Sequence, residues 1–175
     1  MAVALIAAGS AVAAPFTNTD ARFGTVCTFP DEIFTDRQPE PDNGDGQQWL
    51  TADGASLICS GIFNVSDDTP KSFVTAERAS KEAGYEISCS KTGKNWAVLS
   101  GLKDGKIFYE RRLFGKDGVI RTVWIDYPPA VKAKIRSAGR RHCRQPQSTL
   151  SIFGHIPEKV LCANGRRIYR KRVRA

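Results

Sequence analysis

Two Asp-Gly pairs, Asp104-Gly105 and Asp117-Gly118, divide the middle of the chain into runs of alternating apolar and polar residues. Asp-Gly favours tight turns with positive φ, which match the right-handed twist of neighbouring antiparallel strands. The runs alternate with a period of two, as a half-buried strand does. They lie at residues 85–91, 96–102, 106–114 and 119–127. The sequence therefore predicts an antiparallel meander.

Residues upstream of the meander predict further strands and a long loop. Asp53-Gly54 marks a turn between two β-rich runs at 47–51 and 55–65, which predicts a hairpin. Residues 23–29 alternate as a strand does. Residues 30–46 contain three prolines and two glycines among acidic residues, so a loop is expected there.

Two helices are expected beside these strands. Thr69-Pro70 supplies an N-cap and a first-turn proline, residues 71–83 favour helix, and Gly84 lies at the expected C-terminal cap. The expected inward stripe comprises Phe73, Ala76, Ala79 and Ala83. A second, short helix is expected at 130–138. The predicted fold class is α+β, a curved antiparallel sheet of about six to seven strands flanked by one or two helices.

Positive charge is concentrated at the C-terminal end of the chain. Residues 137–175 carry 10 Lys and Arg against 1 acidic residue, whereas residues 1–136 carry 16 against 17. An abrupt change to Arg, Cys, Pro and His is typical of a shifted reading frame in GC-rich DNA. We therefore expect one α+β domain at 22–136 and a basic tail at 137–175 that is poorly ordered or frameshifted.

The first 14 residues are apolar and small, and Ala11-Val12-Ala13 forms an A-x-A cleavage site. This pattern predicts a signal peptide, too short to span a bilayer, which needs about 20 apolar residues. The segment lacks the usual basic residue near its start, so we expect it to be truncated there. Export to the periplasm or outside the cell is predicted, with no transmembrane segment in the mature form.

Five cysteines would then lie in an oxidising compartment, and their odd number leaves at least one unpaired or bonded to another molecule. Cys27, Cys59 and Cys89 fall on the apolar phase of predicted strands, which makes them the candidate disulfide participants. Two of them pairing across the sheet and three buried thiols remain alternatives.

Ionisable residues on the last two strands form the candidate binding face. Glu110, Arg112 and Asp126 lie on adjacent predicted strands, where they could form an acid/base or anion-binding cluster. Cross-strand ion pairing on a solvated face is the plainer interpretation.

No motif predicts a catalytic residue, a cofactor or a metal. The Gly101 to Lys106 segment lacks the spacing of a phosphate loop, and Ser100-Gly101 lacks the context of a hydrolase nucleophile. His142, Cys143, His155 and Cys162 lack the paired spacing of a zinc site.

Three stretches of the chain resemble an uncharacterised exported bacterial domain: Val98-Leu-Ser-Gly101, Gly105-Lys-Ile-Phe-Tyr-Glu-Arg111 and Tyr127-Pro128. The resemblance extends over residues 22–129 and implies a fold similar to the PsbP-like accessory proteins of the photosystem oxygen-evolving complex. It implies no catalytic residue. The similarity ends near Val131, where such domains are expected to finish with an amphipathic helix on the sheet.

We therefore expect a non-enzymatic binding or accessory module of the cell envelope, which meets an envelope protein or a small ligand through the sheet face and the 30–46 loop. A small hydrolase or transferase with a site at Glu110, Arg112 and Asp126 is the alternative. A second alternative is binding of an anionic surface or nucleic acid through the basic tail. Export argues against nucleic acid as the partner.

Overall fold

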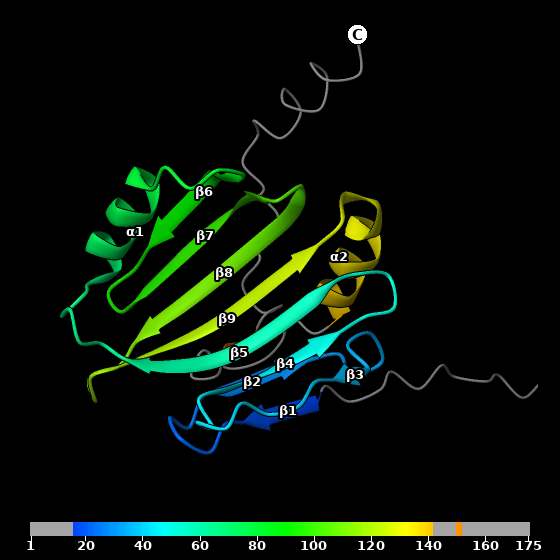
Figure 1. Ribbon diagram of the computed structural model, residues 1–175, viewed down its shortest axis with the longest axis horizontal. Coiled ribbons are helices and arrows are strands. Elements are labelled where there is room, and N and C mark those ends of the chain that lie inside the picture. The colour runs from blue at the N-terminus through cyan, green and yellow to red at the C-terminus, as the bar shows by residue number, and fades with distance from the viewer. Residues whose placement is uncertain (1–15, 142–149, 152–175) are drawn as a thin grey trace, which may run out of the picture.

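The structure is a computed structural model, which describes residues 16–141 and 150–151 of the 175-residue chain. Its centre is a seven-stranded antiparallel sheet with the order β3-β4-β5-β9-β8-β7-β6 (Figure 1). The strands are β3 (Asp36–Arg37), β4 (Gly46–Leu50), β5 (Ser56–Phe63), β6 (Tyr85–Thr92), β7 (Trp96–Lys103), β8 (Lys106–Phe114) and β9 (Val119–Tyr127). The predicted α+β class, with an antiparallel sheet and flanking helices, is confirmed.

The two Asp-Gly pairs form the turns of the meander. Asp104 and Gly105 have φ angles of +50° and +79°, and Gly118 has a φ of +72°. Such angles are available to glycine and, among other residues, chiefly to Asp and Asn. As a result, β8 and β9 begin and end at the predicted residues, and β6 and β7 each run one residue further than predicted.

The predicted hairpin joins the meander through its second strand. β5 pairs with β9 along its whole length, from Ser56 opposite Asp126 to Phe63 opposite Val119. The connection from β5 to β6 is made by helix α1 (Pro70–Ala79), which lies on one face of the sheet over β6 and β7 (Figure 1).

Helix α1 starts where predicted and ends earlier. The Thr69 side chain accepts a hydrogen bond from the Ser72 backbone, while the Ser72 hydroxyl accepts one from the Thr69 backbone. The helix stops at Ala79 rather than near Gly84. Phe73 is buried, but Ala76 and Ala79 are exposed, so the predicted alanine stripe is wrong. The reason is that α1 packs on the sheet through Phe73 and Val74.

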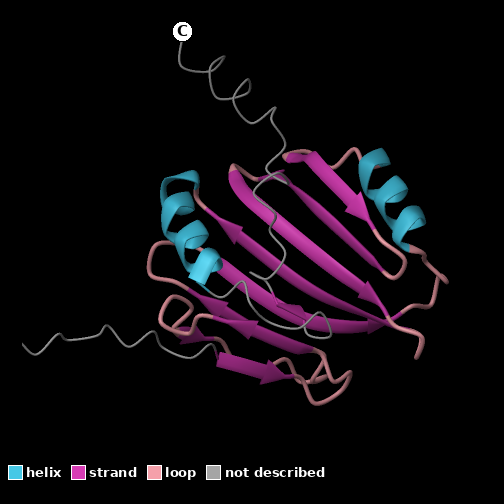
Figure 2. Ribbon diagram, turned by 180° about the vertical axis from the view of Figure 1, so that it is seen from behind, coloured by secondary structure: helices cyan, strands magenta, loops and turns pink. Residues whose placement is uncertain are grey.

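The opposite face of the sheet is covered by N-terminal and C-terminal elements (Figure 2). Strands β1 (Phe16–Thr19) and β2 (Val26–Phe29) form a second sheet with β10 (Leu150–Ser151). After a 3₁₀ turn at Pro129–Val131, helix α2 (Lys132–Arg141) continues past Gly139, further than the predicted short helix. Phe29, Phe34, Trp49 and Ile135 belong to one buried cluster on this side.

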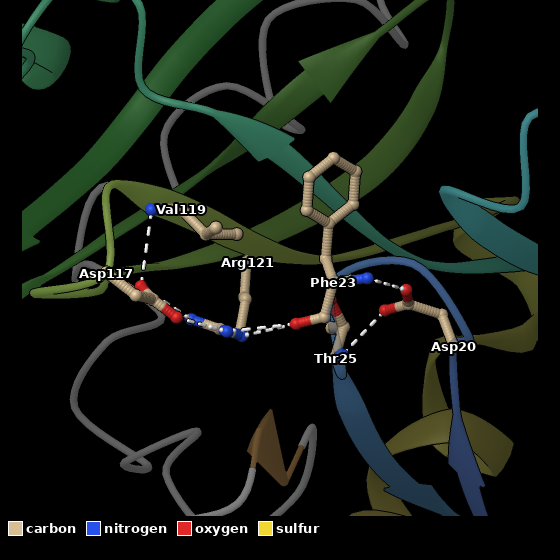
Figure 3. A network of polar contacts seen from close by, with 6 residues as sticks. All are labelled: Asp20, Phe23, Thr25, Asp117, Val119 and Arg121. Atoms are coloured by element: carbon tan, nitrogen blue, oxygen red, sulfur yellow. Dashed lines mark hydrogen bonds and ion pairs between the residues drawn. The ribbon is translucent and has the colours of Figure 1, made fainter.

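A polar network holds the N-terminal segment in a turn, and β2 begins later in the chain than predicted (Figure 3). The Asp20 carboxylate accepts hydrogen bonds from the backbone of Phe23 at 2.7 Å and of Thr25 at 2.6 Å. These bonds hold residues 20–25 in a turn, so the strand predicted at 23–29 starts only at Val26. The Phe23 carbonyl accepts two hydrogen bonds from Arg121 of β9, whose guanidinium also pairs with Asp117.

The predicted signal segment at 1–14 lies outside the described residues, as does the tail apart from 137–141 and 150–151. Within the described part of the chain, neither helix has the length and apolar character needed to traverse a lipid bilayer.

Candidate functional site

Glu110, Arg112 and Asp126 point to the same face of the sheet, the one that carries α1. Glu110 and Arg112 alternate on β8 with side chains that face the other way. Asp126 lies opposite Phe108 in the β8–β9 register, which places it on the side of Glu110 as well. The three residues nonetheless form two separate ion pairs, since Glu110 pairs with Arg112 and Asp126 pairs with Lys106.

The Glu110–Arg112 pair is largely withdrawn from water. The Arg112 Nε atom lies 2.6 Å from Glu110 Oε1, and the Glu110 side chain is only 4% exposed. Burial raises the pKa of Glu110 above its ordinary value, and the Arg112 charge partly opposes that rise. The Arg112 guanidinium also lies 4.0 Å from the centre of the Phe73 ring, so helix α1 contacts the pair through a cation–π interaction.

A row of three stacked rings crosses the same face. Phe108 stacks on Tyr85 with ring centres 5.2 Å apart and on Trp124 with ring centres 4.9 Å apart. The Lys103 ammonium lies 5.4 Å from the Tyr85 ring and 5.8 Å from the Trp124 ring. The Tyr85 hydroxyl bonds to Glu77 of α1, and burial raises its pKa. We name Tyr85, Phe108 and Trp124 the aromatic row.

Asp126 orients the last ring of that row. Its carboxylate accepts a hydrogen bond from the Trp124 indole nitrogen at 3.0 Å and one from Lys106 at 2.9 Å. Phe108 stacks almost parallel on one side of the indole, at an angle of 2°. Because Phe108 belongs to β8 and β5 lies on the other side of β9, the second face of the indole is directed toward β5.

Beyond Trp124, the sheet face has no described helix or strand above it. Figure 1 shows α1 over β6 and β7, with β5 and β9 uncovered by the described elements on this side. The register of β4, β5 and β9 gives this area a mixed polar and apolar surface. We call it the open strip, and its side chains are Gln48, Leu50, Ile58, Ser60, Ile62, Thr122 and Trp124.

The 30–46 segment contributes side chains to both faces of the sheet edge. Ile33 and Phe34 pack into the cluster on the opposite face, with Trp49 and Phe29. Ile33 and Phe34 therefore face away from the open strip, whereas the register places Asp36 of the same segment beside Leu50, at the edge of the strip.

Two of the candidate cysteines are joined. Cys27 of β2 and Cys59 of β5 form a disulfide with their Cα atoms 6.3 Å apart, and both residues are fully buried. The bond ties the smaller sheet to the larger one. Cys89 is also buried, on the same face of the seven-stranded sheet as Cys59.

The charged groups at this face are engaged with one another. Each of Glu110, Arg112 and Asp126 already holds an oppositely charged partner. No three His, Cys, Asp or Glu side chains gather as a metal site in the part of the chain that the structure describes. His142, Cys143, His155 and Cys162 lie outside that part.

The aromatic row was not predicted from the sequence. The row depends on cross-strand register, and its members lie far apart in sequence. Their alternation with polar residues in 106–114 and 119–127 places Phe108 and Trp124 on one face once the turn is known, so that signal was present.

Comparison of the chain with protein-family models, with curated proteins and with solved structures finds no match.

Proposed function

We propose that this protein is a non-enzymatic binding or accessory module of the bacterial cell envelope, exported through its N-terminal segment, with a PsbP-like sheet. The observation that carries the proposal is the open strip beside Trp124. A half-buried apolar and polar strip with one fixed aromatic ring is typical of a protein-binding surface, because such rings contribute large contact area at low entropic cost.

The electrostatic arrangement also favours binding over catalysis. A general acid or base needs a group that can reach the substrate proton, whereas the Glu110 carboxylate is buried and bonded to Arg112. Asp126 is engaged by Lys106 and Trp124. The hydrogen bond to Asp126 and the stacked Phe108 ring hold the Trp124 indole in position, and a preorganised surface binds with a smaller entropy loss.

Site-specific photocrosslinking tests the proposed binding surface. The full chain is produced in the periplasm with a benzoyl-phenylalanine at Ser60, in the open strip, or at Ala76, on the exposed side of α1. We expect one discrete adduct from Ser60, none from Ala76, and loss of the Ser60 adduct when Trp124→Ala is added. Equal adducts from both positions would argue against the open strip.

Export is tested separately by the mature N-terminus. Mass spectrometry of the periplasmic protein should find a chain that starts at residue 14 or 15, after the A-x-A sequence. Recovery of the intact N-terminus from the cytoplasmic fraction alone would contradict the envelope assignment.

The raised pKa of Glu110 favours one alternative, a hydrolase or transferase with a site at Glu110, Arg112 and Asp126. If the protein has such an activity, Glu110→Gln should abolish it, while Ile62→Ser in the open strip should leave it unchanged. The opposite pattern, in which Ile62→Ser abolishes crosslinking and Glu110→Gln has no effect, supports the binding module.

A further inference from the structure

Arg111 is a buried arginine on the face opposite the candidate site. It is 7% exposed, and its neighbour on the same face of β8, Tyr109, is 5% exposed. Figure 2 views the sheet from this side, with α2 in front of it. In the register, Tyr109 lies opposite Ser100 and Arg111 lies opposite Val98, so Ser100 adds a hydroxyl to the same face.

One polar atom of each of these two side chains is buried without a hydrogen-bond partner among the described residues. These atoms are the Arg111 Nε and the Tyr109 hydroxyl oxygen. A buried cation is costly unless it is paired and hydrogen-bonded, and almost all buried polar groups in native structures have partners. Two buried donors without partners on the same strand, one from Arg111 and one from Tyr109, therefore need a physical explanation.

Among the described residues, no acidic side chain on this face of the sheet pairs with Arg111. Over β6, β7, β8 and β9, the one acidic side chain that points this way in the described chain is Glu86, which is exposed on the edge strand and forms no ion pair with Arg111. Lys91 lies in the same cross-strand row as Arg111. Burial raises the pKa of Tyr109, and the nearby Arg111 charge opposes part of that rise, so that the pKa is about 12. The hydroxyl is therefore a neutral donor close to the guanidinium.

The geometry points to an oxyanion site formed by Ser100, Tyr109 and Arg111, for the carboxylate or phosphate head of a small amphiphile. The planar guanidinium presents parallel N–H donors that match such a group, and the two hydroxyls add donors on the same side. Apolar residues flank the donors along and across the strand. Ile107, Leu113 and Trp96 are partly buried there and offer a surface for the apolar body of the ligand.

This site is independent of the proposed binding surface, because alternate residues of β8 point to opposite faces. Glu110 and Arg112 pair with each other on one side, and Tyr109 and Arg111 lie on the other. Variants of one pair can therefore test one surface with the other left intact.

The test is calorimetric titration of the full chain with three probes: decanoate, decyl phosphate and inorganic phosphate. We expect decanoate or decyl phosphate to bind, and inorganic phosphate to bind at least 10-fold more weakly because it lacks the apolar body. The preferred probe identifies the head group as a carboxylate or a phosphate. The Arg111 Nε–H resonance should shift on titration, since that atom gains an acceptor.

Three variants locate the binding. Arg111→Met keeps much of the side-chain volume and should weaken binding more than 10-fold, and Tyr109→Phe should weaken it several-fold. Lys91→Met removes an exposed cation from the same row and should leave binding within 2-fold of the wild type. If Arg111→Met fails to fold, Tyr109→Phe, which removes a single hydroxyl, still tests the site. The inference is overturned if the wild type binds neither amphiphile, or if Arg111→Met or Tyr109→Phe binds as tightly as the wild type.

Discussion

The guanidinium of Arg121 donates two hydrogen bonds, of 2.9 and 3.2 Å, to the backbone carbonyl of Phe23, which lies 98 positions earlier in the chain (Figure 3). The same guanidinium is held from the other side by Asp117, with 2.6 Å between the nearest atoms. Arg121 therefore connects the N-terminal turn to the last strand of the sheet. The Phe23 carbonyl therefore accepts hydrogen bonds from a charged donor, and such bonds are stronger than those from a neutral donor.

Arg121→Met should destabilise the protein by about 1–3 kcal/mol, because the Phe23 carbonyl loses both donors. Urea unfolding measures the change, and amide exchange at Thr25 should accelerate because the turn is released. The matched control is Arg78→Met, whose guanidinium, within the described part of the chain, forms solvent-exposed hydrogen bonds to the Ser90 side chain alone. That control should change stability by a few tenths of a kcal/mol. Equal effects of the two variants would contradict the structural role of Arg121.

The Cys27–Cys59 disulfide should be worth about 4 kcal/mol, from the chain entropy that a crosslink across 32 positions removes from the unfolded state. The double variant Cys27→Ala with Cys59→Ala removes both partners of this bond together, so that neither remains as a buried thiol. Its free energy of unfolding, measured in urea without reductant, should fall by about that amount. An unchanged value would mean that this bond does not form in the folded protein.

The two partners of the Glu110–Arg112 pair should respond unequally to substitution. Arg112→Met leaves a buried carboxylate without its cation, which should cost about 3–5 kcal/mol. Glu110→Gln keeps an oxygen acceptor for Arg112, which is 25% exposed and reaches water, so its cost should be about 1 kcal/mol. Denaturant unfolding at pH 7 compares them, and the reverse order would show that Arg112 is not needed to stabilise the Glu110 charge.

Glu110 also predicts a pH dependence. Its pKa in the folded state lies above the ordinary value of 4.5, so the folded protein binds this proton more tightly than the unfolded chain. Its contribution to stability is therefore lost as pH rises from 4.5 through the folded pKa. The stability of the wild type minus that of Glu110→Gln should increase as pH falls from 7 to about 5. Urea unfolding at several pH values measures it, and a decrease would contradict the sign.

Gly61 permits the closest packing of the N-terminal turn on the sheet. A Cβ atom at this position would lie 2.5 Å from the Phe23 Cβ and 2.8 Å from its Cγ. Gly61→Ala should therefore push Phe23 away and cost about 1–3 kcal/mol. The control is Ser60→Ala, whose side chain points to the other face and should have a small effect. Thermal unfolding distinguishes them, and a neutral Gly61→Ala would mean that Phe23 does not pack on β5.

The strands of the meander could be predicted because their limits are set by local chemistry. Asp104-Gly105 and Asp117-Gly118 specify the turns, and alternation specifies the buried face. Neither the early end of α1 nor its buried side could be predicted in this way. Ala76 and Ala79 are suited to a buried stripe, but only the packed structure shows that the helix contacts the sheet through Phe73 and Val74.

The candidate site was predictable only in part. The sequence correctly predicts adjacent strands for Glu110, Arg112 and Asp126, because a single turn joins β8 to β9. Their partners were not predicted, because Lys106 and Trp124 reach Asp126 through register and rotamer rather than sequence spacing. The pairing of β5 with β9 was also missed, as no local pattern specifies which distant strands are neighbours.

That last pairing has a consequence for how the protein is made. The hairpin of β4 and β5 is synthesised well before β9, yet β5 has no neighbour on its second side until β9 has emerged from the ribosome. Until then its N–H and C=O groups along one edge remain available to other chains. We therefore expect the nascent chain to be most prone to aggregation between synthesis of Phe63 and of Tyr127, and its folding to be slow for its size, since contacts between distant segments close late.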